Sequence, residues 1–366
     1  MAKDNASLIR VTYLYPFDLG LDLELNLRDE HYSKEILRSA DAGEVLFEGR
    51  RIGTAALAGH LYPFGVGMLE LTFDFQDSLA EASDLAVSCE KVHLGRYALN
   101  VFFQSQIETV LAKARRWARA AGPGRIESGR EIFPLLTLTP FHENLGAETF
   151  LNKNKKTLFG VVTGEPSYAR LSEYALKKED LKNIGYYDEE IILINRFGAF
   201  IHSKEEETLK ELIRLALAQY FNAWAANAFL ERSLQGAQRI LENQPPYYHF
   251  WRMPSAYQQV SREQREFGKA KAALVESLHI VHIQNPKIES DWHLKSVHRE
   301  ILGAFESEGL AKTALQRLET IDSIYAHLGE QLSTMFFIFL DFVFLAWLMV
   351  DLIGWVALIA LTAAKN

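Results

Sequence analysis

The stretch that decides the fold is MFFIFLDFVFLAWLMVDLIGWVALIALTAA, which runs from Met335 to Ala364. Between Met335 and Ala363 the only charged residues are Asp341 and Asp351. About 20 apolar residues cross a bilayer core about 30 Å thick, so the stretch has room for one crossing and not for two. The sequence therefore predicts a single transmembrane helix over residues 334–364.

The two ends of the chain predict how this helix is oriented. The N-terminal sequence MAKDNASLIRVTYLYPF has no long apolar run and is not rich in arginine, so it resembles neither a secretory signal nor a transit peptide. Only Lys365 and Asn366 follow the apolar stretch. We therefore expect a tail-anchored, single-pass membrane protein whose N-terminal domain is cytoplasmic.

Composition limits the classes of function. A formal net charge of −8 argues against a dedicated nucleic-acid binder, because neutralising phosphates requires an excess of lysine and arginine. One cysteine, Cys89, excludes an internal disulfide framework and a metal site built from several cysteines. We expect no nucleic-acid partner and no cofactor.

The N-terminal part of the chain, residues 1–203, has the pattern of a mixed α+β domain. Short β-branched or aromatic runs bounded by glycine, proline or asparagine are typical of strands. Between them, residues 98–121 have helical spacing and precede Gly122-Pro123-Gly124, which stops a helix. The predicted strands are SLIRVTYLY, MLELTFDF, FPLLTLT, TLFGVVT and EIILINRFGAFIH.

Residues 204–333 are predicted to form a domain of long, coiled-coil-like helices. Ser203 and Glu206 form a capping-box signature, and the helix that follows can run to about Glu242. Further helices are expected from about residue 257 to 283 and from residue 290 or 291 onward. Gly309 is expected to bend or interrupt the last of these helices.

Two apolar seams with alternating spacings of four and three residues run along these helices. The first seam has a single polar member, Asn227, and such a residue can fix register or oligomer number. The second seam continues directly into the membrane segment. Either seam can pack within one chain or against another subunit, and the pattern leaves both readings open. The second seam comprises Leu318, Ile321, Tyr325, Leu328 and Leu332.

The two membrane acids are the main functional signal. A charged aspartate at the bilayer centre costs at least about 2.5–3.5 kcal/mol, so such residues usually face a bundle interior or a water-filled cavity. At about 100° and 1.5 Å per residue, Asp341 and Asp351 lie about 80° apart around the helix and about 15 Å apart along it. Gly354 shares the Asp351 side, where another helix can approach closely. Two explanations that need no functional role are that Asp341 marks the membrane boundary and that Asp351 is protonated beside a local water defect.

Other chemical motifs are weaker. His279 and His282 are one helical turn apart and can share a metal ion, although this spacing also arises by chance on amphipathic helices. Neither a Walker loop, nor a GxSxG elbow, nor an HExxH motif occurs in the sequence. Glu189 and Glu190 precede a predicted strand and are expected to be solvated. The sequence points to no catalytic residue.

The order of elements also carries two resemblances. The strand EIILINRFGAFIHS, ALAQ at residues 216–219 and FLER at residues 229–232 resemble the "required for meiotic nuclear division" family of membrane proteins over residues 191–359. That resemblance implies a membrane-tethered, self-associating protein that holds other machinery at a membrane. CorA-type magnesium channels are similar in architecture alone, because this chain lacks their Gly-Met-Asn loop and a second membrane helix.

Together these patterns predict a homo-oligomeric scaffold or assembly factor at a lipid bilayer, with a possible protein partner on the cytosolic domain. The alternative is a cation-conducting or membrane-permeabilising oligomer gated through that domain. A membrane-held enzyme is the third class. A channel needs Asp351 to line water, a scaffold needs it for helix contact, and an enzyme needs a cluster of reactive groups in the α+β domain.

Overall fold

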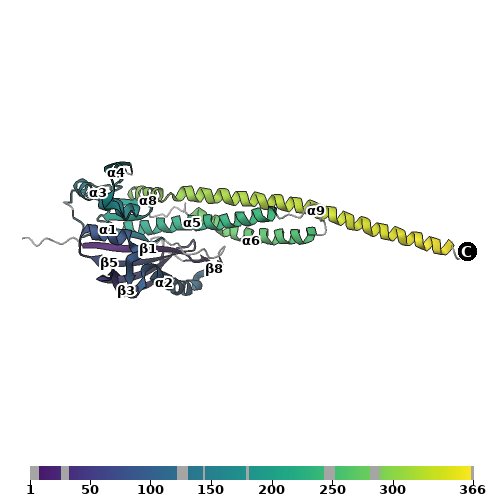
Figure 1. Cartoon of the computed structure of the whole chain (residues 1–366), viewed down its shortest axis with the longest axis horizontal. Helices are drawn as coiled ribbons and strands as arrows, with labels where there is room; N and C mark the ends of the chain where they lie inside the picture. The colour runs from purple at the N-terminus through teal and green to yellow at the C-terminus, as the bar shows by residue number, and fades with distance from the viewer. Residues whose placement is uncertain are drawn as a thin grey trace, which may run out of the picture. The chain divides into compact units, whose positions relative to one another are not determined.

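A computed structural model describes residues 8–25, 33–121, 131–142, 145–178, 181–242, 252–280, 288 and 290–363 (Figure 1). The chain divides into two compact units. The first contains residues up to Ala226 together with Ala273–Lys312, and the second contains Asn227–Ala272 and Thr313–Asn366. The first unit is an α+β domain and the second is built from long helices, which confirms the predicted fold class.

The strands all belong to the first unit. They are β1 (Leu8–Asp18), β2 (Leu21–Leu23), β3 (Lys34–Phe47), β4 (Arg50–Leu61), β5 (Val66–Phe75), β6 (Val92–Leu94), β7 (Tyr97–Ala98), β8 (Ala118–Ala121), β9 (Phe133–Thr139), β10 (Ile191–Asn195) and β11 (Gly198–His202).

The helices alternate with the strands and then dominate the later part of the chain. They are α1 (Leu79–Val87), α2 (Leu99–Ala114), α3 (Ala147–Thr163), α4 (Glu173–Lys178), α5 (Glu206–Glu242), α6 (Met253–Ile280), α8 (Trp292–Ala304) and α9 (Ser307–Ala363). Short 3₁₀ helices are η1 (Cys89–Lys91), η2 (Arg115–Trp117) and η3 (Tyr168–Arg170).

Within the described residues, one large sheet has the strand order β10-β11-β9-β1-β5-β4-β3-β6-β7, and β2 pairs with β8 apart from it. Every pairing in the large sheet is antiparallel except β11 with β9, which is parallel. Strand β1 is fourth in this order and lies between β9 and β5, with Thr12 opposite Thr72 of β5 and opposite Leu135 of β9. The middle of the sheet therefore depends on contacts between residues far apart in the sequence.

Strand β1 is buried on both faces because helices cover both sides of the sheet. Side chains alternate along a strand, so Tyr13 and Tyr15 share one face. Tyr13 donates a hydrogen bond to the Leu85 carbonyl of α1, and Tyr15 stacks on Phe103 of α2 at 5.0 Å between ring centroids. The opposite face, which carries Arg10 and Thr12, lies against the first half of α5. Arg10 reaches Glu206 of α5 at 3.0 Å.

The described strands correct several sequence predictions. TLFGVVT was predicted to be a strand and lies in α3, because a short apolar run fits a buried helix as well as a strand. The predicted helix over residues 98–121 ends as α2 at Ala114, and β8 follows. Strands β3 and β4 were not predicted. Their turn, Glu48-Gly49, has positive φ values of 50° and 86°, as tight hairpin turns require.

The predicted long helix after Ser203 is confirmed as α5, but its N-terminus is built differently from a capping box. The Ser203 hydroxyl accepts a hydrogen bond from the Glu205 backbone and donates one to Glu190 at 2.6 Å. Glu206 instead pairs with Arg10. Glu190 is 3 % exposed, so the expectation that it is solvated was wrong.

The second unit contains the later part of α5, most of α6 and most of α9. Helices α6 and α9 pack through Phe267 and Tyr325, whose ring centroids are 5.6 Å apart, and through an ion pair between Lys271 and Asp322. The interruption between α8 and α9 lies at Phe305 and Glu306, where Glu306 has a φ of 52°, and not at Gly309 as expected.

Helix α9 changes character along its length (Figure 1). Its earlier half buries an apolar row in the helical unit, whereas every residue from Leu340 to Ala363 is exposed. Residues 340–363 extend roughly 36 Å along the axis, which exceeds a bilayer core of about 30 Å. Among the described residues α9 is the one helix long and apolar enough to cross a membrane, judged by length and composition. This supports a single-pass membrane protein.

The turn between β10 and β11 offers a test of the packing of the first unit. A Cβ atom on Gly198 would lie 2.3 Å from the backbone oxygen of Val161 in α3, so α3 or β11 would have to move. Overpacking of this kind typically costs about 1–3 kcal/mol. We expect Gly198→Ala to lower the free energy of unfolding by that amount, measured by chemical denaturation followed by circular dichroism.

Gly303 in α8 of the same unit is the matched control. A Cβ atom there has no neighbour within 4 Å among the described residues, and alanine favours the helix. Gly303→Ala should leave stability unchanged or raise it by up to about 1 kcal/mol. Equal effects of the two substitutions would contradict the close approach of β11 and α3.

Candidate functional site

The predicted membrane acids both lie in the exposed half of α9. Asp341, Asp351 and Gly354 are exposed, and the large side chains around them are exposed as well. Trp347 and Trp355, for example, are 63 % and 62 % exposed. Within the described part of the chain neither carboxylate has a polar partner. As far as the described residues extend, both acids thus lie on an apolar helix without a counter-charge.

The predicted seam residues are buried within the helical unit. Asn227 lies in the same unit, where its backbone oxygen and Oδ1 accept hydrogen bonds from Arg317 at 3.2 and 3.3 Å. Arg317 also lies 3.6 Å from Glu231. Helices of the same chain therefore cover the apolar row of α9. The row comprises Leu318, Ile321, Tyr325, Leu328 and Leu332, none more than 5 % exposed.

The predicted metal pair falls largely outside the description. His282 lies outside the described residues, and His279 is described in its backbone alone. Among the described residues no group of three or more histidine, cysteine, aspartate or glutamate side chains is arranged to hold a metal ion.

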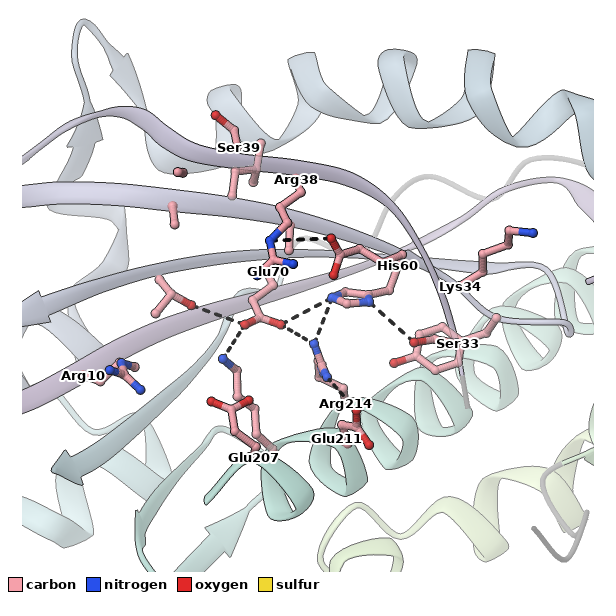
Figure 2. A pocket seen from close by; sticks show the side chains of 18 residues that line it. Arg10, Ser33, Lys34, Arg38, Ser39, His60, Glu70, Glu207, Glu211 and Arg214 are labelled. Carbon is pink, nitrogen blue, oxygen red and sulfur yellow. Dashed lines mark hydrogen bonds and ion pairs between the residues drawn. The ribbon is translucent and has the colours of Figure 1, made fainter. Parts of the chain in front are cut away.

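A buried charge cluster between the sheet and α5 is the most unusual group of side chains in the first unit (Figure 2). Glu70 projects from β5, and one of its oxygens lies 2.5 Å from Lys210 Nζ while the other lies 2.7 Å from Arg214 Nη1. Thr72 donates a hydrogen bond to Glu70 at 3.3 Å. The side chains of Glu70, Lys210 and Arg214 are only 7 %, 9 % and 11 % exposed. One carboxylate thus bridges two cations one helical turn apart.

His60 on β4 completes the cluster as a neutral group. Its Nε2 lies 2.9 Å from Arg214 Nη1 and 3.6 Å from Glu70. A guanidinium group only donates hydrogen bonds, so His60 Nε2 is an acceptor and the ring proton resides on Nδ1. That Nδ1 atom lies 3.5 Å from the Ser33 hydroxyl (Figure 2).

The environment of Glu70 fixes its charge. Burial alone would raise the pKa of the Glu70 carboxyl, but the positive charges of Lys210 and Arg214 and the hydrogen bond from Lys210 outweigh burial and hold that pKa well below the usual range of glutamate. Burial opposes ionisation of Arg214, and the charge of Glu70 outweighs it, so the pKa of Arg214 is raised. Glu70 is therefore a permanent anion near neutral pH and a poor general base.

An open pocket with a volume of about 810 Å³ borders this cluster. Strands β3, β4 and β5 contribute its floor, where Ala56 and Ala58 are small, and α5 contributes a wall that carries Lys210 and Arg214. Arg38 and Glu35 also line the pocket; both side chains are exposed, and they lie 3.9 Å apart. The pocket combines fixed charges of both signs with a shape suited to a small molecule.

Sequence reasoning missed this site for a physical reason. In MLELTFDF, Glu70 and Thr72 alternate with apolar residues, as on a strand with one face in water. That face is covered by α5, which the sequence does not show. The available signal was a second one: Lys210 and Arg214 are four residues apart, so they share one side of the helix, and each directly follows an apolar seam position, Leu209 or Ile213.

Residues 34–208 match a family model described as the N-terminal domain of the uncharacterized protein MJ0711. The matched range runs from β3 to the start of α5, so it includes His60 and Glu70 and stops before Lys210 and Arg214. No curated protein and no solved structure matches the chain. The resemblances to the meiotic nuclear division family and to CorA-type channels stay predictions.

Replacing Glu70 by glutamine tests whether the carboxylate holds the cluster together. Lys210 and Arg214 would then remain buried beside a neutral amide, and removing one partner of a buried charge pair typically costs about 3–5 kcal/mol. We expect Glu70→Gln to lower the free energy of unfolding by this amount at neutral pH. Glu44→Gln is the control, because Glu44 is 54 % exposed in its pair with Arg51 and such pairs contribute about 1 kcal/mol or less.

The same variant tests the charge state of Glu70 through pH. An unfolded chain protonates this glutamate near pH 4.3, whereas the folded chain holds it ionised to lower pH. The stability that Glu70 contributes is therefore present above about pH 4.3 and declines as pH falls toward its lowered pKa. Wild type should lose stability more steeply than Glu70→Gln below about pH 4.3. Parallel acid profiles would contradict the assignment.

Proposed function

We propose that the protein is a membrane-anchored, self-associating scaffold or assembly factor. Helix α9 anchors it in the bilayer, and the α+β unit, on the cytoplasmic side, engages a protein partner. The observation that supports this most directly is the exposed apolar half of α9 with Asp341 and Asp351 on its surface. The earlier half of α9 packs against other helices of the chain, whereas the described residues leave the apolar half uncovered. Packing within the chain therefore does not explain why this half is apolar.

The argument for self-association rests on the free energy of the acids. A single helix in lipid offers Asp351 no partner, and an ionised aspartate at the membrane centre costs at least about 2.5–3.5 kcal/mol. Another copy of α9 can shield the carboxylate from lipid and donate a hydrogen bond to it. Gly354, which lies on the same side and has open space around its Cβ position, permits close approach of a second helix.

We propose that Asp351 and Gly354 of the membrane segment, and not the seam, carry this association. Leu318, Tyr325 and Leu332 are already covered by helices of the same chain. The surface left for another copy is therefore the apolar half of α9.

We expect Asp351→Leu to shift the protein toward smaller assemblies in neutral detergent, because the substitution removes the burial demand that favours helix contact. The measurement is the mass of the protein component of the protein–detergent complex, determined by light scattering. Ile353→Leu, about 200° away around the helix, is the control and should leave the mass unchanged. An unchanged mass for Asp351→Leu would refute the idea that this acid lies between subunits.

Cation conduction is the second candidate, and it rests on the same two exposed carboxylates, since rings of acids can line cation pathways. It predicts that liposomes carrying the wild-type protein conduct cations and that Asp351→Asn, which keeps the shape and removes the charge, reduces the flux. A scaffold predicts no flux from either protein. Fluorescent reporters of Na⁺, K⁺ and Mg²⁺ inside the liposomes distinguish the two outcomes.

A further inference from the structure

The charges around the pocket beside Glu70 do not balance. Lys210 and Arg214 each carry a positive charge, Glu70 carries one negative charge, and the hydrogen-bond geometry makes His60 neutral. Glu211 lies 3.9 Å from Arg214, but its side chain is 36 % exposed, so solvent weakens that interaction. The inner wall of the pocket therefore holds about one positive charge in excess, and a buried charge is costly unless it is paired.

The two cations also retain hydrogen-bonding capacity. An ammonium group has three N–H donors and a guanidinium group has five. In the described part of the chain, Lys210 contacts Glu70, and Arg214 uses one nitrogen, Nη1, for both Glu70 and His60. Both residues line the pocket, so their remaining donors are available to a ligand there.

We propose that this pocket binds the oxyanion group, phosphate or carboxylate, of a small molecule, with Arg214 and Lys210 as its direct contacts. The oxyanion supplies the missing negative charge and accepts the remaining hydrogen bonds, and charge-assisted bonds of this kind are about twice as strong as neutral ones. Arg38, at the edge of the pocket, is positioned to contact a second group of the ligand. This site is independent of the role proposed for α9.

The surroundings of the site favour a small ligand over a polyanion such as nucleic acid. A volume of about 810 Å³ lies within the range of ordinary small-molecule pockets. Glu207 and Glu211 of α5 line the same pocket, and the chain has a formal net charge of −8. An extended polyanion would meet repulsion outside the pocket, whereas one oxyanion at the inner wall meets the two cations.

The test is isothermal titration calorimetry of the full chain in neutral detergent, with pyrophosphate and citrate as separate probes. The two probes distinguish a phosphate ligand from a carboxylate ligand. We expect saturable binding of at least one probe, with one site per chain. Absence of saturable binding for both probes up to about 10 mM would overturn the proposal.

Two variants locate the site. Arg214→Gln removes the excess charge and leaves the pair between Glu70 and Lys210, so affinity should fall by at least about tenfold. Glu207→Gln removes a repulsive charge from the lining, so affinity should rise about two- to threefold. Glu44→Gln makes the same charge change outside the lining and should leave affinity unchanged.

The outcomes separate a binding role from a structural one. Wild-type affinity in a folded Arg214→Gln protein would overturn the proposal. If Arg214→Gln fails to fold, the comparison between Glu207→Gln and Glu44→Gln decides, because Glu207 is exposed and its replacement leaves the buried cluster intact. Tighter binding in Glu207→Gln alone supports the site, and equal affinities in these two variants overturn it.

Discussion

The contact on which the first unit depends is the bridge that Glu70 makes between two cations of α5. It joins the middle of the sheet to the helix that covers one of its faces, at distances of 2.5 and 2.7 Å. Without this carboxylate, packing α5 on that face would bury two unpaired cations, and the free-energy cost of doing so would oppose the packing. Arg10 adds a second attachment through Glu206, closer to the start of the helix. The rotation of α5 about its own axis is therefore set by electrostatic contacts as well as by apolar packing.

The same bridge explains why the pocket beside it stays polar. An apolar contact between sheet and helix would close over the small side chains of β4, whereas charged groups need either partners or access to solvent. Ala56 and Ala58 leave space, and the charged side chains of α5 border that space. The features that fix α5 on the sheet thus also create a site with donors directed into a cavity.

Long, periodic elements could be predicted from the sequence, and short or covered ones could not. The extended amphipathic pattern after Ser203 and the apolar run after Met335 each have a single structural solution, and α5 and α9 are the result. By contrast, β3 and β4 contain SADAG and TAALAG, whose alanine and glycine residues have low strand propensity, and tertiary pairing with β5 determines their structure. The membrane acids were predictable because polarity inside an apolar run is visible locally. The cluster around Glu70 was not, because its members come from β4, β5 and α5.

Because α9 is continuous, its packed half determines where the two membrane acids lie around the helix axis. The apolar row of α9 packs against helices of the same chain. Because residues 307–363 contain no proline that would kink the helix, this packing also sets the angular position of the residues that follow the row. At about 100° per residue, Asp341 points about 180° away from the row that ends at Leu332, and Asp351 about 100° away. The packing of the helical unit therefore sets the direction of both carboxylates. Asp341 is directed away from the side of α9 that packs on the chain's own helices, and a rotation of the packed part of α9 about its axis would turn both acids with it.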